Sequence, residues 1–112
     1  MPLNKVFSSA AAAVADISDG AVIMISGFGR PGVPETLVRA LLEKKPKGLT
    51  VISNACHGRF PDWYDAGRLV CAGLVTRAIT SFPVAPGLGS PAERLWKMGL
   101  LDIETIPQGI LA

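Results

Sequence analysis

A glycine-rich stretch between two apolar segments carries the strongest chemical signal in the sequence. Gly27-Phe28-Gly29-Arg30-Pro31-Gly32 matches the pattern G-x-G-x-x-G and follows the apolar run AVIMIS (21–26). A glycine-rich turn between a buried strand and a helix start presents backbone N–H groups at the positive end of the helix dipole. Glycine also allows positive φ angles and close approach of a ligand to the backbone. The stretch therefore predicts a site for an anionic or polarised oxygen, while a simple tight turn remains an equal alternative.

Three features of the flanking sequence argue against the dinucleotide site that this pattern often indicates. Pro31 and Pro34 flank the third glycine, so we expect the helix to begin only after it. The next apolar segment ends in Ser53-Asn54-Ala55, without the acidic residue that binds ribose hydroxyls. A predicted helix also precedes the first strand. Dinucleotide binding is therefore the second interpretation, and a measurable NAD affinity that is lost when Gly29 becomes bulky would support it.

The elements that must position this loop follow from the alternation of apolar and helical patterns. Helices are predicted over AAAAVADI (10–17) after the candidate N-caps Ser8 and Ser9, and over AERLWKM (92–98) after Ser90 and Pro91. A further helix is predicted with Pro34 in its first turn, Glu35 near its positive end and LVRALLEK (37–44) supplying the helical period. Strands are predicted over AVIMIS (21–26), LTVIS (49–53), LVTRAITSF (74–82) and DIETI (102–106). The continuous apolar run AVIMIS is typical of a strand covered on both faces, whereas DIETI alternates and predicts a less buried strand. Residues 54–67 are expected to form a loop and PQGILA (107–112) a turn. The alternation predicts an α/β fold, a layered sandwich with a mostly parallel sheet.

Composition and charge favour one domain without a nucleic-acid or membrane surface. The chain has 112 residues, of which 49% are hydrophobic, and a net charge of +2. No apolar run approaches the ~18 residues of a membrane span, and the first residues do not resemble a signal peptide, so we expect a cytoplasmic protein. The densest basic group, Lys44, Lys45 and Lys47 before Gly48, is typical of a helix C-terminus. Nucleic-acid binding would need more basic residues on one face.

The single histidine and the two cysteines are weaker candidates for chemistry. His57 follows the second predicted strand, but one histidine cannot form a metal site, and a loop histidine without a catalytic task is favoured. Cys56 would be a nucleophile only if its pKa were lowered, and both Cys56 and Cys71 are expected to be reduced and buried. The aromatic residues of the loop should cover its own small core, and Trp96 should serve packing or a subunit contact.

A longer pattern around the glycine loop is more specific than the glycines alone. From Asp19 to Pro34 the chain reads Asp-Gly, two residues, an apolar triplet, Ser-Gly-Phe, three residues and Gly-x-Pro. This resembles the signature of the α subunit of family I coenzyme A-transferases, the 3-oxoacid CoA-transferases, with Ser26 replacing the first glycine of Gly-Gly-Phe. The similarity extends to NKVFSSAAAAVADISDG, PETLVRALLEK, LTVISN, RAITSFP and PQGILA. The family's α subunit continues well past PQGILA. We therefore expect residues 1–112 to be a single, incomplete α-subunit domain, either a fragment, a truncated product or one half of a split subunit.

The resemblance implies an enzyme of two subunits with related α/β folds. Such enzymes move CoA from an acyl-CoA, often succinyl-CoA, to a carboxylate such as acetoacetate, 3-oxoadipate or acetate. A β-subunit glutamate within Ser-Glu-Asn-Gly attacks the thioester to give an anhydride, then a glutamyl-CoA thioester. That motif is absent here, and none of the four glutamates has a matching context. The chain is thus expected to need a β-subunit partner, to take a CoA thioester as substrate without a bound cofactor, and to be inactive alone. Thioester hydrolysis or decarboxylation on the same scaffold, and a non-catalytic module, are the alternatives.

The resemblance also implies which residues meet the substrate. The loop that binds the thioester oxygen would comprise Gly27, Phe28, Gly29, Gly32 and Pro34, and substrate-binding side chains would be those of Ser26, Asn54 and Gln108. Fixed backbone N–H donors stabilise the charge that develops on a thioester oxygen, each by about 3 kcal/mol. Asn54 capping a turn, and a simple turn around Gln108, are equally compatible with the sequence. Ser26 would be strained at positive φ, and otherwise its hydroxyl could act as an extra donor.

Overall fold

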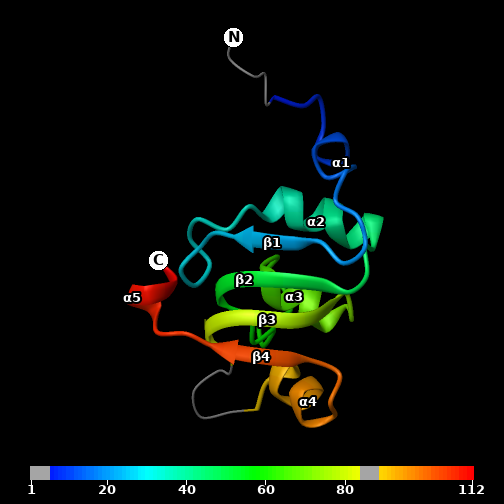
Figure 1. Ribbon diagram of the computed structural model, residues 1–112. Coiled ribbons are helices and arrows are strands. Elements are labelled where there is room, and N and C mark those ends of the chain that lie inside the picture. Colours follow the sequence, from blue (N-terminus) through cyan, green and yellow to red (C-terminus); the bar gives the residue numbers. More distant parts are fainter. Residues whose placement is uncertain (1–5, 84–88) are drawn as a thin grey trace.

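The computed structural model describes residues 6–83 and 89–112, which form a four-stranded, fully parallel sheet with helices packed against it (Figure 1). The elements are α1 (Ala10–Ala13), β1 (Val22–Ile25), α2 (Glu35–Lys44), β2 (Leu49–Ala55), α3 (Ala66–Cys71), β3 (Val75–Phe82), α4 (Pro91–Lys97), β4 (Asp102–Thr105) and α5 (Gln108–Leu111). The predicted α/β class and parallel sheet are confirmed.

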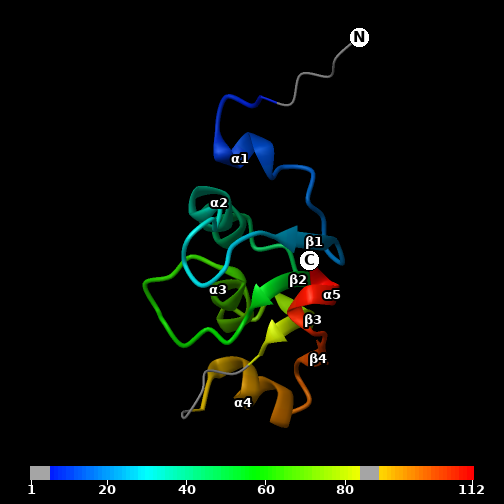
Figure 2. The ribbon, with the colours of Figure 1, turned by 90° about the vertical axis from the view of Figure 1, so that its left-hand side faces the viewer.

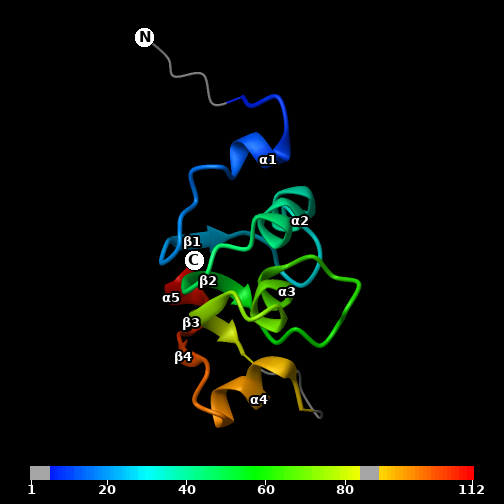
Figure 3. The same ribbon diagram turned by 90° about the vertical axis from the view of Figure 1, so that its right-hand side faces the viewer.

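The strands lie in the sheet in their order along the chain, β1-β2-β3-β4. Right-handed crossovers that all advance in the same direction place their helices on one face of a sheet. Figures 2 and 3 show this arrangement: α2, α3 and α4 lie on one side of the sheet, whereas α5 and the chain end lie toward the other. The three main helices therefore build one core layer with the sheet.

The helix-covered face of the sheet holds the hydrophobic core. Leu49 and Val51 of β2 are fully buried there with Val38 of α2 and with apolar residues of α3. On the opposite face the side chains of Val22 and Met24 are 65% and 76% exposed. The expectation that the first strand is covered on both faces is thus wrong within the described residues. Its continuous apolar pattern correctly predicts a strand, but the described part of the chain supplies helices to only one face.

Three helices differ from the predictions, each for a local reason. The first ends at Ala13 and not at residue 17, because the hydrogen bonds beyond Val14 run to the residue three positions earlier, from Ala15 N to Ala12 O (3.4 Å) and from Ile17 N to Val14 O (3.0 Å). α3 lies at the end of the predicted loop and just beyond it, where the Asp65 side chain accepts from Arg68 N as an N-cap. α5 replaces the predicted turn at 107–112.

The start of α4 is formed as predicted, with Ser90 as N-cap and Pro91 in the first turn. The Ser90 side chain is fully buried and its Oγ accepts from Glu93 N at 3.2 Å. Ser90→Ala is therefore expected to lower the free energy of unfolding by about 1 kcal/mol, because the Glu93 amide loses its acceptor. Urea titration followed by circular dichroism measures this change. Ser8→Ala, at an exposed residue that is not the cap of α1, is the control and should change stability by less than about 0.5 kcal/mol; equal effects of the two would contradict the capping role.

Candidate functional site

The glycine loop connects the end of β1 to the start of α2. Gly27, Gly29 and Gly32 have φ angles of 123°, 67° and 81°, a region that glycine occupies without strain. α2 begins at Glu35, after the third glycine, as the two prolines predicted. This helix start does not fit the dinucleotide fingerprint, in which the third glycine lies within the first helical turn.

Two hydrogen bonds close the loop on itself. Ser26 Oγ donates to Gly32 O at 2.8 Å, and Phe28 N donates to Pro31 O at 3.1 Å. Ser26 does not have a positive φ, so serine carries no backbone strain here. Its hydroxyl holds the loop together and is engaged there, so it is not an additional free donor. Within the described residues the amides of Gly29 and Gly32 donate to no protein acceptor and are available to a ligand.

Residues from three distant parts of the chain meet at the carboxyl ends of β1 and β2. A cavity of about 490 Å³ is lined there by Ser26, Gly27 and Pro34 of the loop, by Asn54 of β2 and by Gln108 of α5. The carboxyl ends of parallel strands are where open α/β sheets bind ligands. Apolar side chains of β1, β2 and α5 supply the rest of the wall. The structure thus brings together five of the eight residues that the resemblance implied.

The two amide side chains in this cavity each retain a buried oxygen without a hydrogen-bond donor. Asn54 Oδ1 and Gln108 Oε1 have no partner among the described residues. Asn54 is 9% exposed, so it does not reach bulk water freely. A buried polar atom without a partner costs about 1–3 kcal/mol, and a ligand with donor groups would relieve that cost. The pair is therefore the candidate polar end of the cavity, and its role in binding stays a prediction.

The other three predicted loop residues lie away from this cavity. Phe28 is exposed, and its amide is engaged within the loop. Gly29 lines a much smaller adjacent cavity of about 10 Å³, together with Asn54 and Asp65. Gly32 supplies the carbonyl that accepts from Ser26. Their contribution to a substrate site stays a prediction.

Sequence reasoning missed Asp65, which is buried beside the loop. Burial raises the pKa of its carboxyl above 3.8, opposed by hydrogen bonding from Arg68 N and by the nearby His57. The signal that could have revealed it was an acidic N-cap directly before an apolar helical segment. Asp65 adds a titratable group to the small cavity that Gly29 and Asn54 share.

Cys56 is buried, as the sequence predicts, and the absence of a catalytic task for His57 stays a prediction. Cys56 is fully buried, and burial raises the pKa of its thiol to about 12. His57 is partly buried, its pKa is lowered by burial, and its Nδ1 accepts from Arg59 N at 3.1 Å. Cys71 is exposed, so the expectation that it is buried is wrong; it is the last residue of α3, and its Sγ lies 3.5 Å from Gly58 O. Residues 6–83 and 89–112 contain no cluster of histidine, cysteine and acidic side chains that could hold a metal ion.

Asp65→Asn is expected to reduce the pH dependence of stability. Because the pKa of this carboxyl is raised in the folded state, the folded protein holds a proton there at pH values at which the unfolded chain has released it. The contribution of the carboxyl to the free energy of unfolding therefore falls as the pH rises from about 3.8 through the raised value. Asparagine keeps the N-cap acceptor without the buried charge. Urea titrations of both proteins at pH 4 and pH 7 measure this effect. The free energy of unfolding of the variant, relative to that of the parent, should be higher at pH 7 than at pH 4. If the difference in free energy of unfolding between variant and parent is the same at both pH values, the raised pKa is contradicted.

Comparisons with known proteins find related sequences and a related fold. The sequence profile of coenzyme A transferases matches residues 7–112. The chain is 36% identical over 98% of its length to the α-type subunit of 3-oxoadipate CoA-transferase from Pseudomonas putida, covering 46% of that protein. It is 37% identical over 96% of its length to the mitochondrial succinyl-CoA:3-ketoacid coenzyme A transferase 2 of Homo sapiens, covering 20% of it. A crystal structure of a variant of the decarboxylase AibA/AibB superposes with a TM-score of 0.64 at 27% identity, covering 87% of this chain and 37% of that one.

The match runs through nearly the whole chain but through only part of each relative. The chain spans about half the length of the bacterial α-type subunits to which it is similar. No helix of the described residues is long and apolar enough to cross a membrane. The signature around the glycine loop, the parallel sheet and the family profile agree, and the chain belongs to the coenzyme A transferase family.

Proposed function

We propose that the chain is an α-type component of an enzyme that moves coenzyme A from an acyl-CoA, such as succinyl-CoA, to a 3-oxoacid or another short carboxylate. The observation that carries this proposal is the cavity at the carboxyl ends of β1 and β2, where residues of the glycine loop lie together with Asn54 and Gln108. The names of the relatives, transferases acting with 3-oxoadipate and with succinyl-CoA and 3-ketoacids, support the substrate class.

The chemistry of the loop suits acyl transfer. Attack on a thioester moves negative charge onto the carbonyl oxygen, and fixed N–H donors stabilise that charge without reorganisation. Gly29 lies outside the large cavity but lines the adjacent small one, which shares Gly27 and Asn54 with it. Its amide donates to no protein acceptor in the described residues, which suits this task. Asn54 and Gln108 carry both donor and acceptor atoms, which suits holding a substrate carboxylate and the polar atoms beside its thioester. The nucleophile would be the glutamate of a partner β subunit, which supplies Ser-Glu-Asn-Gly.

The proposal is tested by producing the chain together with the β subunit of a bacterial relative and with the part of the α-type relative beyond the matched region, as a separate polypeptide. Transfer of CoA from succinyl-CoA to acetoacetate or 3-oxoadipate, measured as formation of the new thioester, would support it. Asn54→Ala should remove most of that activity, while Thr76→Ala, at an exposed position of β3, should leave it unchanged. A stable complex without any transfer would contradict the proposal.

A decarboxylase acting on a related substrate is the second candidate, and the similarity to the decarboxylase AibA/AibB favours it. The same complex distinguishes the two. Release of CO₂ from a carboxylated acyl-CoA, without transfer of CoA to an added acid, would favour decarboxylation. Thioester hydrolysis would appear as free CoA with neither product.

A further inference from the structure

The cavity of about 10 Å³ beside the glycine loop joins three segments that are distant along the chain. It is lined by Gly27 and Gly29 of the loop, by Asn54 near the end of β2 and by Asp65, the N-cap of α3. A cavity of this volume is about the smallest that holds one water molecule, and such a water needs about two to four polar partners. The polar groups around the cavity therefore decide whether water binds there.

Two of these groups have no hydrogen-bond partner within residues 6–83 and 89–112. Asn54 Oδ1 is buried and receives no hydrogen bond, and the amide of Gly29 donates to no protein acceptor. The first group needs a donor and the second needs an acceptor. A water molecule supplies both, because its O–H groups donate and its oxygen accepts.

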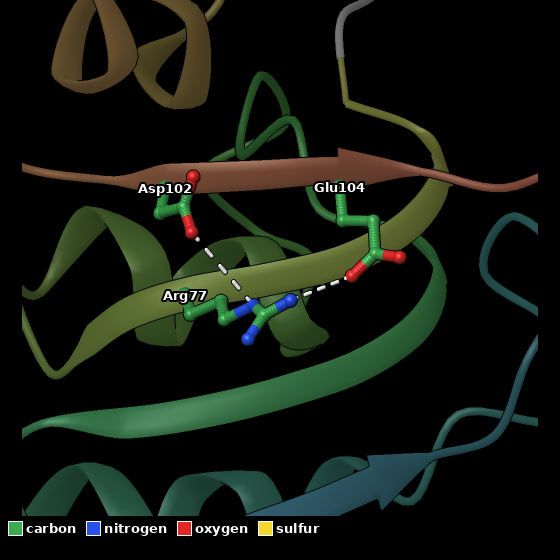
Figure 4. Close-up of polar contacts among 3 residues, drawn as sticks. All are labelled: Arg77, Asp102 and Glu104. Atoms are coloured by element: carbon green, nitrogen blue, oxygen red, sulfur yellow. Dashed lines mark hydrogen bonds and ion pairs between the residues drawn. The ribbon is translucent and has the colours of Figure 1, made fainter.

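Asp65 supplies the third polar group, a buried carboxyl without a cationic partner. It is 8% exposed and forms no ion pair among the described residues. The carboxylates of Asp102 and Glu104, in contrast, are exposed and share the guanidinium of Arg77, at 3.8 and 2.7 Å (Figure 4). A buried carboxyl that lacks such a cation needs hydrogen-bond donors instead.

The protein donors around Asp65 leave part of its carboxyl available. Asp65 Oδ1 accepts from Arg68 N at 3.3 Å, which is long for a hydrogen bond of this kind. The guanidinium of Arg68 donates to Pro61 O. A carboxyl has about four lone-pair sites, so Asp65 can accept further hydrogen bonds. Burial still raises its pKa, because desolvation outweighs the hydrogen bonds from backbone amides and the charge of His57.

We propose that, in the chain without substrate, the small cavity binds one water molecule that donates to Asp65 and to Asn54 Oδ1 and accepts from the amide of Gly29. Asp65 is thereby a positioning residue for the Asn54 side chain. The role of Asn54 toward a substrate rests on the proposed function, whereas the water site rests on the geometry of this chain. During transfer a thioester oxygen would take over the Gly29 amide, while the two hydrogen bonds that orient Asn54 remain.

The consequence for the large cavity follows from how Asn54 is held. Its backbone is fixed, because Asn54 O accepts from Thr80 Oγ1 at 3.0 Å and β2 pairs with β3. The χ2 torsion of asparagine is broad, so sterics alone do not choose the orientation of the amide. A water that holds Oδ1 from the small cavity leaves Nδ2 for the large cavity, which Asn54 also lines. The N–H donors of Nδ2 suit a carboxylate, so the group held there would be the carboxylate of the acceptor acid.

The experiment follows the Asn54 side-chain amide by proton–nitrogen NMR of the 112-residue chain while the pH is raised. Its resonances, identified by their loss in Asn54→Ala, should shift with the midpoint at which the carboxyl carbon of Asp65 titrates, above 3.8. The water donates to the ionised carboxyl and accepts from the protonated one, so its hydrogen bond to Asn54 changes at that midpoint. Asp65→Asn keeps the N-cap acceptor and should abolish the transition. Gln108 lines the large cavity and not the small one, so its side-chain amide is the internal control and should not follow this midpoint.

His57 is the other group near Asp65 that titrates in the range of this experiment. Burial lowers its pKa, and the charge of Asp65 opposes that change. His57→Ala removes this titration, so the Asn54 transition should persist in that variant. The remaining ionisable groups nearby keep one charge state over this range: the thiols of Cys56 and Cys71, whose pKa values burial raises, and the guanidinium groups of Arg39 and Arg68 over the ring of Tyr64.

A nuclear Overhauser effect between the Gly29 amide proton and water locates the bridging molecule. This effect, together with an Asn54 transition at the Asp65 midpoint, would support the inference. Asn54 resonances that do not respond to Asp65 would overturn it, and a coupled transition without the effect at Gly29 would overturn the bridging water. Because these measurements need no β subunit and no substrate, a complex that transfers no CoA would refute the proposed function and leave the water site standing. The absence of the Asn54 transition would do the reverse.

Discussion

Replacing Gly27 with alanine is expected to lower the rate of CoA transfer roughly a hundredfold or more, the loss that follows removal of an oxyanion-binding donor. Gly27 has φ 123°, a conformation that alanine rarely adopts. An added Cβ would lie 2.4 Å from Val33 Cγ2 and 3.2 Å from Val33 N. Because Val33 leads directly into α2, relief of this contact must move the loop that spans residues 27–32.

The measurement is the transfer rate in the complex with a β subunit, together with the melting temperature of the variant. Gly99→Ala is the matched control, because Gly99 also has a positive φ (74°) but an added Cβ would meet nothing within 4 Å. Both variants carry backbone strain, and only Gly27→Ala adds the clash inside the loop. If both retain similar transfer rates, the loop does not bind the reacting oxygen.

The sequence predicted the parts of the fold that depend on local chemistry. The N-cap at Ser90, the helix start after Pro34 and the helix end before Gly48 all follow from backbone hydrogen bonding, which short-range patterns report well. The low burial of β4 followed from its alternation. Such signals act within a few residues, so a single sequence is enough to recognise them.

The parts that could not be predicted depend on distant neighbours. The apolar residues of β1 indicate that the strand belongs in a covered sheet, but they do not specify which polypeptide covers Met24. α3 was missed because Gly67 is a poor helix former, and its place is fixed by packing against a loop nine residues earlier. Asn54 and Gln108 line one cavity only because α5 forms. The four residues of α5 show no helical period in the sequence, so this helix was not predicted. The family resemblance supplied the candidate site residues that periodicity could not, and their role stays a prediction.

Gly67→Ala is expected to give the largest loss of stability of the substitutions considered, about 2–3 kcal/mol. An added Cβ on Gly67 would lie 2.5 Å from Gly58 N and 2.7 Å from Gly58 Cα. Both contacts are with backbone, so no side chain can rotate to relieve them. Gly58 itself has φ 73°, and its own Cβ position lies 2.6 Å from Cys71 Sγ, which also belongs to α3, so the loop and α3 are in close contact at both glycines. Either α3 or the loop that follows β2 must shift.

Urea titration of Gly67→Ala against Gly109→Ala isolates this contact. Gly109 lies in α5 with a negative φ and open space around its Cβ position, so alanine there should be neutral or slightly stabilising. Since α3 starts at Asp65 and Ala66, which line the small cavity beside Gly29, a shift of α3 should also change the pKa of Asp65. A variant as stable as the parent would mean that the two glycines do not touch, and that the loop from Asn54 to Asp65 is held against the sheet by something other than α3.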